Sequence, residues 1–329
     1  MKRWWWLVFV LAGCTGTQEP ALPGLVGVVH GSELTFFVAK DLQPGGGLAA
    51  PAPVGPASWD LGGAGVDAVR PVGRDEVWVL RPDALVRFST AGLSTTAAPQ
   101  PAGEVVLDLA AEGVDCTGGY LRPGTAALLV VCAVGDVWKV PYTGQPPERV
   151  GTVGDPSETR YALGPGDEVV RLDARQICRA DCGADQTHAL SPIGDPVDLV
   201  FDAETGRLYA LFRDPFRVQA LVWEPASAPR LGSPVDADAL DPVLGLVVGQ
   251  GRAVAFGDDL FTVDAEARVT PEERLAFGRY TAGLISPDAF LYLGRAGSVD
   301  VYDLLALSTR QARPVGLEPQ ALVFVPVQE

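Results

Sequence analysis

One phrase recurs along the chain: an apolar strand, a turn rich in Gly and Asp, a second apolar strand, a short polar turn and a third strand. Its clearest copy spans residues 196–223. The first strands of the copies centre on Val69, Asp108, Ala162, Leu199, Leu246, Leu284 and Val323. These centres are separated by about 42 residues on average, which is the length of one four-stranded propeller blade.

The remaining strands of each copy fit the same architecture. Second strands are expected near residues 77–80, 128–132, 169–172, 208–212, 253–256 and 290–293. They are apolar at most consecutive positions, as in strands covered on both faces by neighbouring blades. With 38 Gly and 28 Pro among 329 residues, the composition favours many turns and few long helices. The sequence therefore predicts an all-β protein.

The two ends of the chain complement each other. Residues 320–327 form a first strand with nothing after it, whereas residues 25–29 and 34–39 form second and third strands with no first strand before them. Joined, they make one composite blade and remove an exposed sheet edge. We expect a seven-bladed β-propeller closed by pairing of the C-terminal inner strand with the N-terminal strands.

Two alternatives remain open at this point. The interval of 54 residues between Asp108 and Ala162 is longer than the others, so a different division into six or eight blades fits as well. A pair of β-sandwiches is the other all-β reading.

The segment from Asp202 to Leu211 reads DAETGRLYAL. It resembles the strand–turn–strand phrase of YVTN-like and NHL-like bacterial propellers. This resemblance covers one blade and implies fold only, because unrelated functions share such folds.

The N-terminus indicates export. Lys2 and Arg3 precede a short apolar run, which ends at Leu-Ala-Gly before Cys14. The run is too short to span a bilayer and is typical of an export signal. An ordinary signal peptide and a buried apolar segment are the alternatives to the lipoprotein signal described next. The four residues ending at Cys14 resemble the lipobox of bacterial lipoproteins. The resemblance implies cleavage before Cys14, its lipidation and a membrane anchor.

The expected domains follow from this processing. Residues 1–13 are a signal peptide, residues 14–24 a lipidated tether and residues 25–329 the propeller. Thr15 after the lipidated cysteine favours the outer membrane by the sorting rule of enteric bacteria, with the periplasmic or surface-facing side left open.

Four cysteines remain after Cys14, an even number that suits an oxidising compartment. We expect disulfides Cys116–Cys132 and Cys178–Cys182, because each pair lies within one repeat. Four-cysteine zinc is the alternative, but the tight C-x2-C spacing of such sites is absent from the sequence.

Charged residues recur in the turns between second and third strands. Arginine suits carboxylate pairing and is common in binding hot spots, so these turns form a candidate binding face. The alternative is a set of ordinary solvated turns. The candidate residues are Arg81, Asp83, Arg213, Asp214, Asp258, Asp259 and Arg295.

Enzymatic signatures are scarce. The sequence holds two histidines, His30 and His188, and no H-E-x-x-H, G-x-S-x-G or Walker-type motif. It contains no asparagine, although gluconolactonase-like propellers bind their catalytic metal partly through Asn side chains. With 41 acidic against 25 basic residues, a nucleic-acid-binding surface is not expected. We expect no catalytic residue, metal or cofactor.

These observations predict a monomeric, lipid-anchored envelope protein whose propeller is a non-enzymatic binding or scaffold module for a protein or glycan. One alternative is a hydrolase or lactonase with a dispersed active site in the channel. Another is an outer-membrane assembly factor, similar to the propeller lipoprotein of the barrel-assembly machinery.

Overall fold

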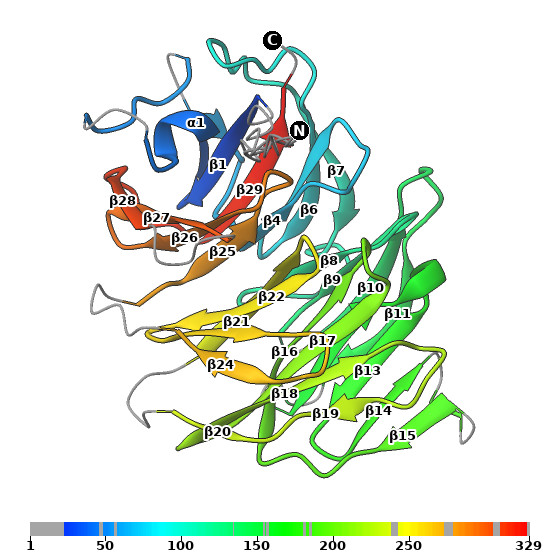
Figure 1. Ribbon diagram of the computed structural model, residues 1–329. Coiled ribbons are helices and arrows are strands. Elements are labelled where there is room, and N and C mark those ends of the chain that lie inside the picture. Colours follow the sequence, from blue (N-terminus) through cyan, green and yellow to red (C-terminus); the bar gives the residue numbers. More distant parts are fainter. Residues whose placement is uncertain are drawn as a thin grey trace, which may run out of the picture.

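Seven antiparallel sheets make up the described part of the chain in its computed structural model (Figure 1). Six are built from consecutive strands, and the seventh combines strands from the two ends of the chain. The structure describes residues 23–45, 49–55, 58–133, 135–153, 155, 158–179, 182–183, 186–237, 243–272, 279–304 and 310–327. The predicted signal peptide and Cys14 lie outside these residues.

Each sheet is one blade of a propeller. The inner strands are β4 (Asp67–Val69), β8 (Tyr120–Pro123), β12 (Thr159–Leu163), β16 (Asp195–Asp202), β21 (Val243–Gly249), β25 (Ala282–Ile285) and β29 (Ala321–Pro326). We number the blades 1 to 7 in this order. Successive inner strands contact one another, and β29 touches both β25 and β4, so the inner strands form a closed ring.

The second strands lie at the predicted positions, and a third strand follows each of them along the chain. The second strands are β5 (Glu76–Leu80), β9 (Ala127–Val131), β13 (Val169–Asp173), β17 (Arg207–Asp214), β22 (Arg252–Gly257), β26 (Phe290–Arg295) and, in blade 7, β1 (Gly24–His30). The third strands are β6 (Ala84–Ser89), β10 (Gly135–Pro141), β14 (Gln176–Arg179), β18 (Arg217–Trp223), β23 (Leu260–Val263), β27 (Ser298–Asp303) and β2 (Glu33–Val38).

The outer strands are shorter and more exposed. They are β7 (Gly103–Asp108), β11 (Glu148–Val153), β15 (Thr187–Ala189), β19 (Arg230–Leu231), β24 (Val269–Pro271), β28 (Arg310–Pro314) and β3 (Trp59–Asp60), with β20 (Val235–Asp236) as an extra strand in blade 4. The helical elements are α1 (Ala39–Leu42), which begins where the third strand of blade 7 was expected to end, and a 3-10 turn at Pro165–Asp167.

The closure of the ring is confirmed. Strand β29 pairs antiparallel with β1, from Gly24 opposite Pro326 to Val29 opposite Ala321. Figure 1 shows the C-terminal red strand beside the N-terminal blue one. The structure starts β1 at Gly24, which the sequence had placed at the end of the tether.

The expected inner strand at Asp108 is wrong. Residues 103–108 form the outer strand β7 of blade 1, and the inner strand of blade 2 is β8 at Tyr120–Pro123. Apolar residues in β7 imitate an inner strand, although Val105 is largely exposed. The interval from Asp108 to Ala162 is long because it begins on the outer strand of blade 1 and includes the connection between blades 1 and 2 as well as blade 2, and the number of blades stays at seven.

Both predicted disulfides are present. Cys116 lies in the connection between blades 1 and 2 and bonds to Cys132 after β9, with 4.4 Å between their Cα atoms. This bond attaches the long connection to the second strand of blade 2. Cys178 on β14 bonds to Cys182 four residues later.

The hydrophobic core lies between blades. Trp78 of blade 1, for example, packs 5.7 Å from Tyr142 of blade 2 between ring centroids. Second-strand residues such as Leu128 and Leu211 are fully buried, as the unbroken apolar runs predict. Each blade therefore depends on its neighbours for burial.

Candidate functional site

The inner strands surround a central channel with a cavity volume of about 1250 Å³. In the meander of each blade, the inner strand starts at the face that carries the turns between second and third strands. We call this the turn face. The opposite face carries Pro23, whose carbonyl oxygen accepts a hydrogen bond of 3.0 Å from the Val327 amide, and we call it the terminal face.

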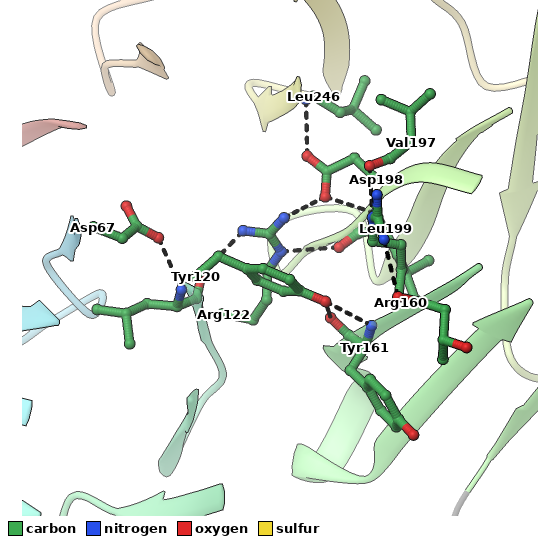
Figure 2. A network of polar contacts seen from close by, with 11 residues as sticks. Asp67, Tyr120, Arg122, Arg160, Tyr161, Val197, Asp198, Leu199 and Leu246 are labelled. Carbon is green, nitrogen blue, oxygen red and sulfur yellow. Dashed lines mark hydrogen bonds and ion pairs between the residues drawn. The ribbon is translucent and has the colours of Figure 1, made fainter. Parts of the chain in front are cut away.

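A polar network in the channel wall joins blades 1 to 5, as Figure 2 shows. Asp67 of blade 1 accepts a hydrogen bond of 2.8 Å from the amide of Leu121 in blade 2. The Tyr120 hydroxyl of blade 2 lies 2.9 Å from the amide nitrogen of Tyr161 in blade 3, which donates to it. Each of these contacts joins one inner strand to the next.

The centre of this network is the ion pair between Arg122 and Asp198 (Figure 2). Arg122 of blade 2 also donates to the Leu199 carbonyl at 2.9 Å, so it connects blade 2 directly to blade 4. The other oxygen of Asp198 accepts a hydrogen bond of 2.9 Å from the Leu246 amide of blade 5. A charged hydrogen-bonded pair of this kind fixes strand positions, because breaking it leaves a buried charge.

Burial shifts the titration of this network. It raises the pKa of Asp67, although the amides of Leu121 and Ala68 oppose the shift by donating to the carboxylate. It also raises the pKa of the Tyr120 hydroxyl. Burial alone would lower the pKa of Arg122, but Asp198 and its other neighbours outweigh it and raise that pKa above its usual value.

The rest of the channel wall, from blades 5 to 7, carries no charged side chain among the described residues that line the cavity. Gly245 of blade 5 precedes Leu246 as Asp198 precedes Leu199, so glycine stands where blade 4 has a carboxylate. A Cβ atom at Gly245 or Gly283 would lie within about 3 Å of the Phe256 ring. Phe256 thus occupies the space that side chains at these positions would need.

The predicted binding residues all lie at turns on the turn face, but they are not one cluster. Arg81 pairs with Asp83 through two hydrogen bonds of 2.9 and 2.6 Å. Asp214 accepts from the Phe216 amide at 2.8 Å and pairs with Arg217. Arg295 pairs with the buried Asp300 at 3.3 Å. Asp258 and Asp259 form the partly buried turn of blade 5, and Arg213 is the second-to-last residue of β17. A role in binding stays a prediction for these residues.

Sequence reasoning missed the aromatic side chain that is most exposed on that face among the described residues. Phe216 lies at the tip of the turn between β17 and β18 and is 65% exposed. The hydrogen bond from its amide to Asp214 and the Asp214–Arg217 ion pair hold this turn. The apolar residue between Pro215 and Arg217 was the available signal, since solvated turns seldom place phenylalanine at the tip.

Each of the two histidines contacts a neighbouring side chain of the fold. Burial lowers the pKa of His30, with Glu33 opposing the shift, and its Nε2 atom lies 2.8 Å from the Thr35 hydroxyl. His188 packs edge-on against Trp223 at 5.4 Å between ring centroids.

The described residues contain neither a cluster of metal ligands nor a helix able to span a membrane. No group of three or more His, Cys, Asp or Glu side chains there is placed to hold a metal ion. No helix in the same part of the chain has the length and hydropathy needed to cross a bilayer.

Comparison with solved structures supports the fold. A chain of the nidogen/laminin complex superposes with a TM-score of 0.57 at 9% identity, covering 92% of this chain and 98% of that chain. Apo AztD from Citrobacter koseri gives 0.59 at 11% identity, with 92% and 97% covered. A functionally unknown protein from Desulfotomaculum acetoxidans DSM 771 gives 0.58 at 13% identity, with 92% and 98% covered.

Sequence comparison gives no family. No protein-family model matches the chain, and no curated protein matches it either. At such low identities the structural similarity extends to the fold alone: the chain is a seven-bladed β-propeller, similar in architecture to propellers of different functions.

Proposed function

We propose that this protein is a lipid-anchored component of the bacterial outer membrane whose propeller binds a protein partner through the turn face. The observation that carries the proposal is Phe216, an exposed aromatic ring on a turn held by its own hydrogen bonds. Rigid exposed aromatic residues are frequent anchors of protein interfaces, because little conformational entropy is lost when they are buried.

The position of the chain ends supports an anchored arrangement. Pro23 lies on the terminal face beside Val327, and the candidate turns lie on the opposite face. An anchor at Cys14, nine residues before Pro23, would therefore hold the propeller with its turn face directed away from the membrane. That orientation leaves the turn face open to a partner.

The channel chemistry favours binding over catalysis. The carboxylates of Asp67 and Asp198 are engaged by backbone amides, and Asp198 is also paired with Arg122. A general acid or base must instead be within reach of a substrate proton. A propeller of this fold occurs in the nidogen/laminin complex, which shows that the architecture can take part in a protein complex.

Two matched variants test the proposal. Phe216→Ala removes an exposed apolar side chain from the turn face, and Val72→Ala removes one, 86% exposed, from a turn of the terminal face. Envelope proteins captured on each variant are quantified by mass spectrometry against the unmodified protein. We expect Phe216→Ala to deplete a specific protein at least tenfold and Val72→Ala to retain it. Equal capture by the three proteins contradicts the proposal, and capture of a glycan alone favours the other class of partner.

A further inference from the structure

Charge is distributed unevenly around the channel. The charged side chains that line the cavity, among the described residues, come from blades 1 to 4. Blades 5 to 7 instead present half-buried apolar side chains from three consecutive inner strands, namely Val247, Ile285 and Phe324. The channel therefore has a charged wall and an apolar wall.

Most charged groups of the first wall already have a hydrogen-bond or ion-pair partner. Arg122 pairs with Asp198, and Arg160 donates to the carbonyl oxygen of Val197 at 2.7 Å. Asp67 accepts two backbone hydrogen bonds, and Asp202 accepts bonds from the amide and hydroxyl of its own turn. None of these groups needs a ligand to satisfy it.

Arg70 differs from them. It follows β4 at the terminal-face end of the channel wall, and its side chain is 15% exposed. Its guanidinium makes no hydrogen bond to any described residue, and its Nε atom is buried without a partner. The nearest carboxylate oxygen belongs to the solvent-exposed Asp75, 3.7 Å from Nη2. Burial lowers the pKa of Arg70, and the charge of Asp75 opposes this shift only in part. The cost of removing this cation from water is therefore only partly compensated.

We propose that the channel binds an amphipathic anion, with the anionic head on the guanidinium of Arg70 and the apolar tail along Val247, Ile285 and Phe324. A guanidinium forms two parallel hydrogen bonds to a carboxylate or phosphate, which would satisfy its buried donors. The cavity of about 1250 Å³ exceeds the roughly 300–1,000 Å³ of common ligand sites, so it accommodates a small amphiphile. This site is separate from the turn face and does not depend on the function proposed above.

The probes are three molecules with the same twelve-carbon tail: laurate, dodecanol and dodecyltrimethylammonium. Their heads are anionic, neutral and cationic. Binding to the purified protein is measured by calorimetry below the micellar concentration of each probe. We expect saturable laurate binding at least tenfold tighter than that of dodecanol, and none for the cation.

Arg70→Met keeps an apolar stem and removes the charge, whereas Arg70→Lys keeps the charge. Arg268→Met is the matched control, because Arg268 is 73% exposed and lies away from the residues that line the cavity. We expect Arg70→Met to lose the preference for laurate, Arg70→Lys to retain part of it and Arg268→Met to retain all of it. Thermal unfolding of each variant verifies folding, and since burial of the Arg70 charge opposes folding, Arg70→Met should not lower the midpoint.

The proposal is overturned if laurate shows no saturable binding to the unmodified protein. It is also overturned if Arg70→Met binds laurate as tightly as the unmodified protein does. Failure of this experiment leaves capture through the turn face unaffected, so the two proposals fail separately.

Discussion

Arg122 and Asp198 form an ion pair that connects the second blade of the propeller to the fourth. Asp198 also accepts the amide of Leu246 from the fifth blade, so one carboxylate holds three blades in place. We expect Asp198→Ala to lower the free energy of unfolding by about 3–5 kcal/mol, because Arg122 would remain buried without its partner. Urea unfolding measures this loss.

A double variant provides the control for that prediction. Arg122→Met combined with Asp198→Ala removes both charges, so it should be less destabilised than the sum of the single variants. Simple additivity would show that the pair is not coupled.

The pH dependence of stability should report Asp67. Burial raises its folded-state pKa above the ordinary aspartate value, so the folded protein binds more protons than the unfolded chain between those two values. Protonated Asp67 therefore contributes to the free energy of unfolding at low pH, and this contribution is lost as the pH rises through the folded-state pKa. We expect the unfolding free energy of Asp67→Asn, taken relative to the unmodified protein, to increase with pH across this window. A difference that is constant or decreases with pH contradicts the assignment.

Closure of the ring should be essential for folding. Deletion of residues 320–329 removes the inner strand of blade 7 and exposes an edge of β1. We expect the truncated protein to aggregate or unfold. A milder pair of variants supports the same test: Val325→Ala in the buried β29 should cost about 2 kcal/mol or more, and Val105→Ala in the exposed β7 should cost under about 0.5 kcal/mol. Similar chemical unfolding midpoints for these two variants would contradict the closure.

Lipidation at Cys14 remains a prediction from the sequence, because this residue lies outside the described part of the chain. Cys14→Ser should release the protein from the membrane fraction or leave its signal peptide uncleaved. Fractionation with intact-mass measurement of the N-terminal peptide distinguishes these outcomes. A cleaved, unlipidated protein that stays in the membrane fraction would show that another feature anchors it.

Much of the fold is predictable because each blade is marked in the sequence by short apolar runs separated by turn residues. The second strand at Glu76–Leu80 and the third strand at Ala84–Ser89 show this, since both carry apolar runs bounded by turn residues. The inner strand β8 escaped prediction because Tyr120–Pro123 is short and carries an arginine and a proline. Its side chains serve the polar network of the channel instead of the core between blades.

The candidate sites were less predictable for a related reason. Arg122 and Asp198 are 76 residues apart in sequence, and only the curvature of the ring brings them together. Arg70 stands out because its buried Nε atom has no hydrogen-bond partner. A sequence does not show which polar atoms lack a partner in the folded protein. Local turns, in contrast, are visible in a sequence: Arg213, Asp214 and Pro215 predict a charged turn, but the exposure of Phe216 beside them does not follow from the pattern.

In the proposed arrangement, the turn face binds the partner and the terminal face points toward the membrane. A photoreactive amino acid placed at residue 216 or at residue 72 of the full chain, expressed in its native envelope and irradiated, tests this most directly. We predict that position 216 forms a discrete crosslink to one protein and that position 72 does not. A crosslink to that protein from position 72, with none from position 216, would contradict the account.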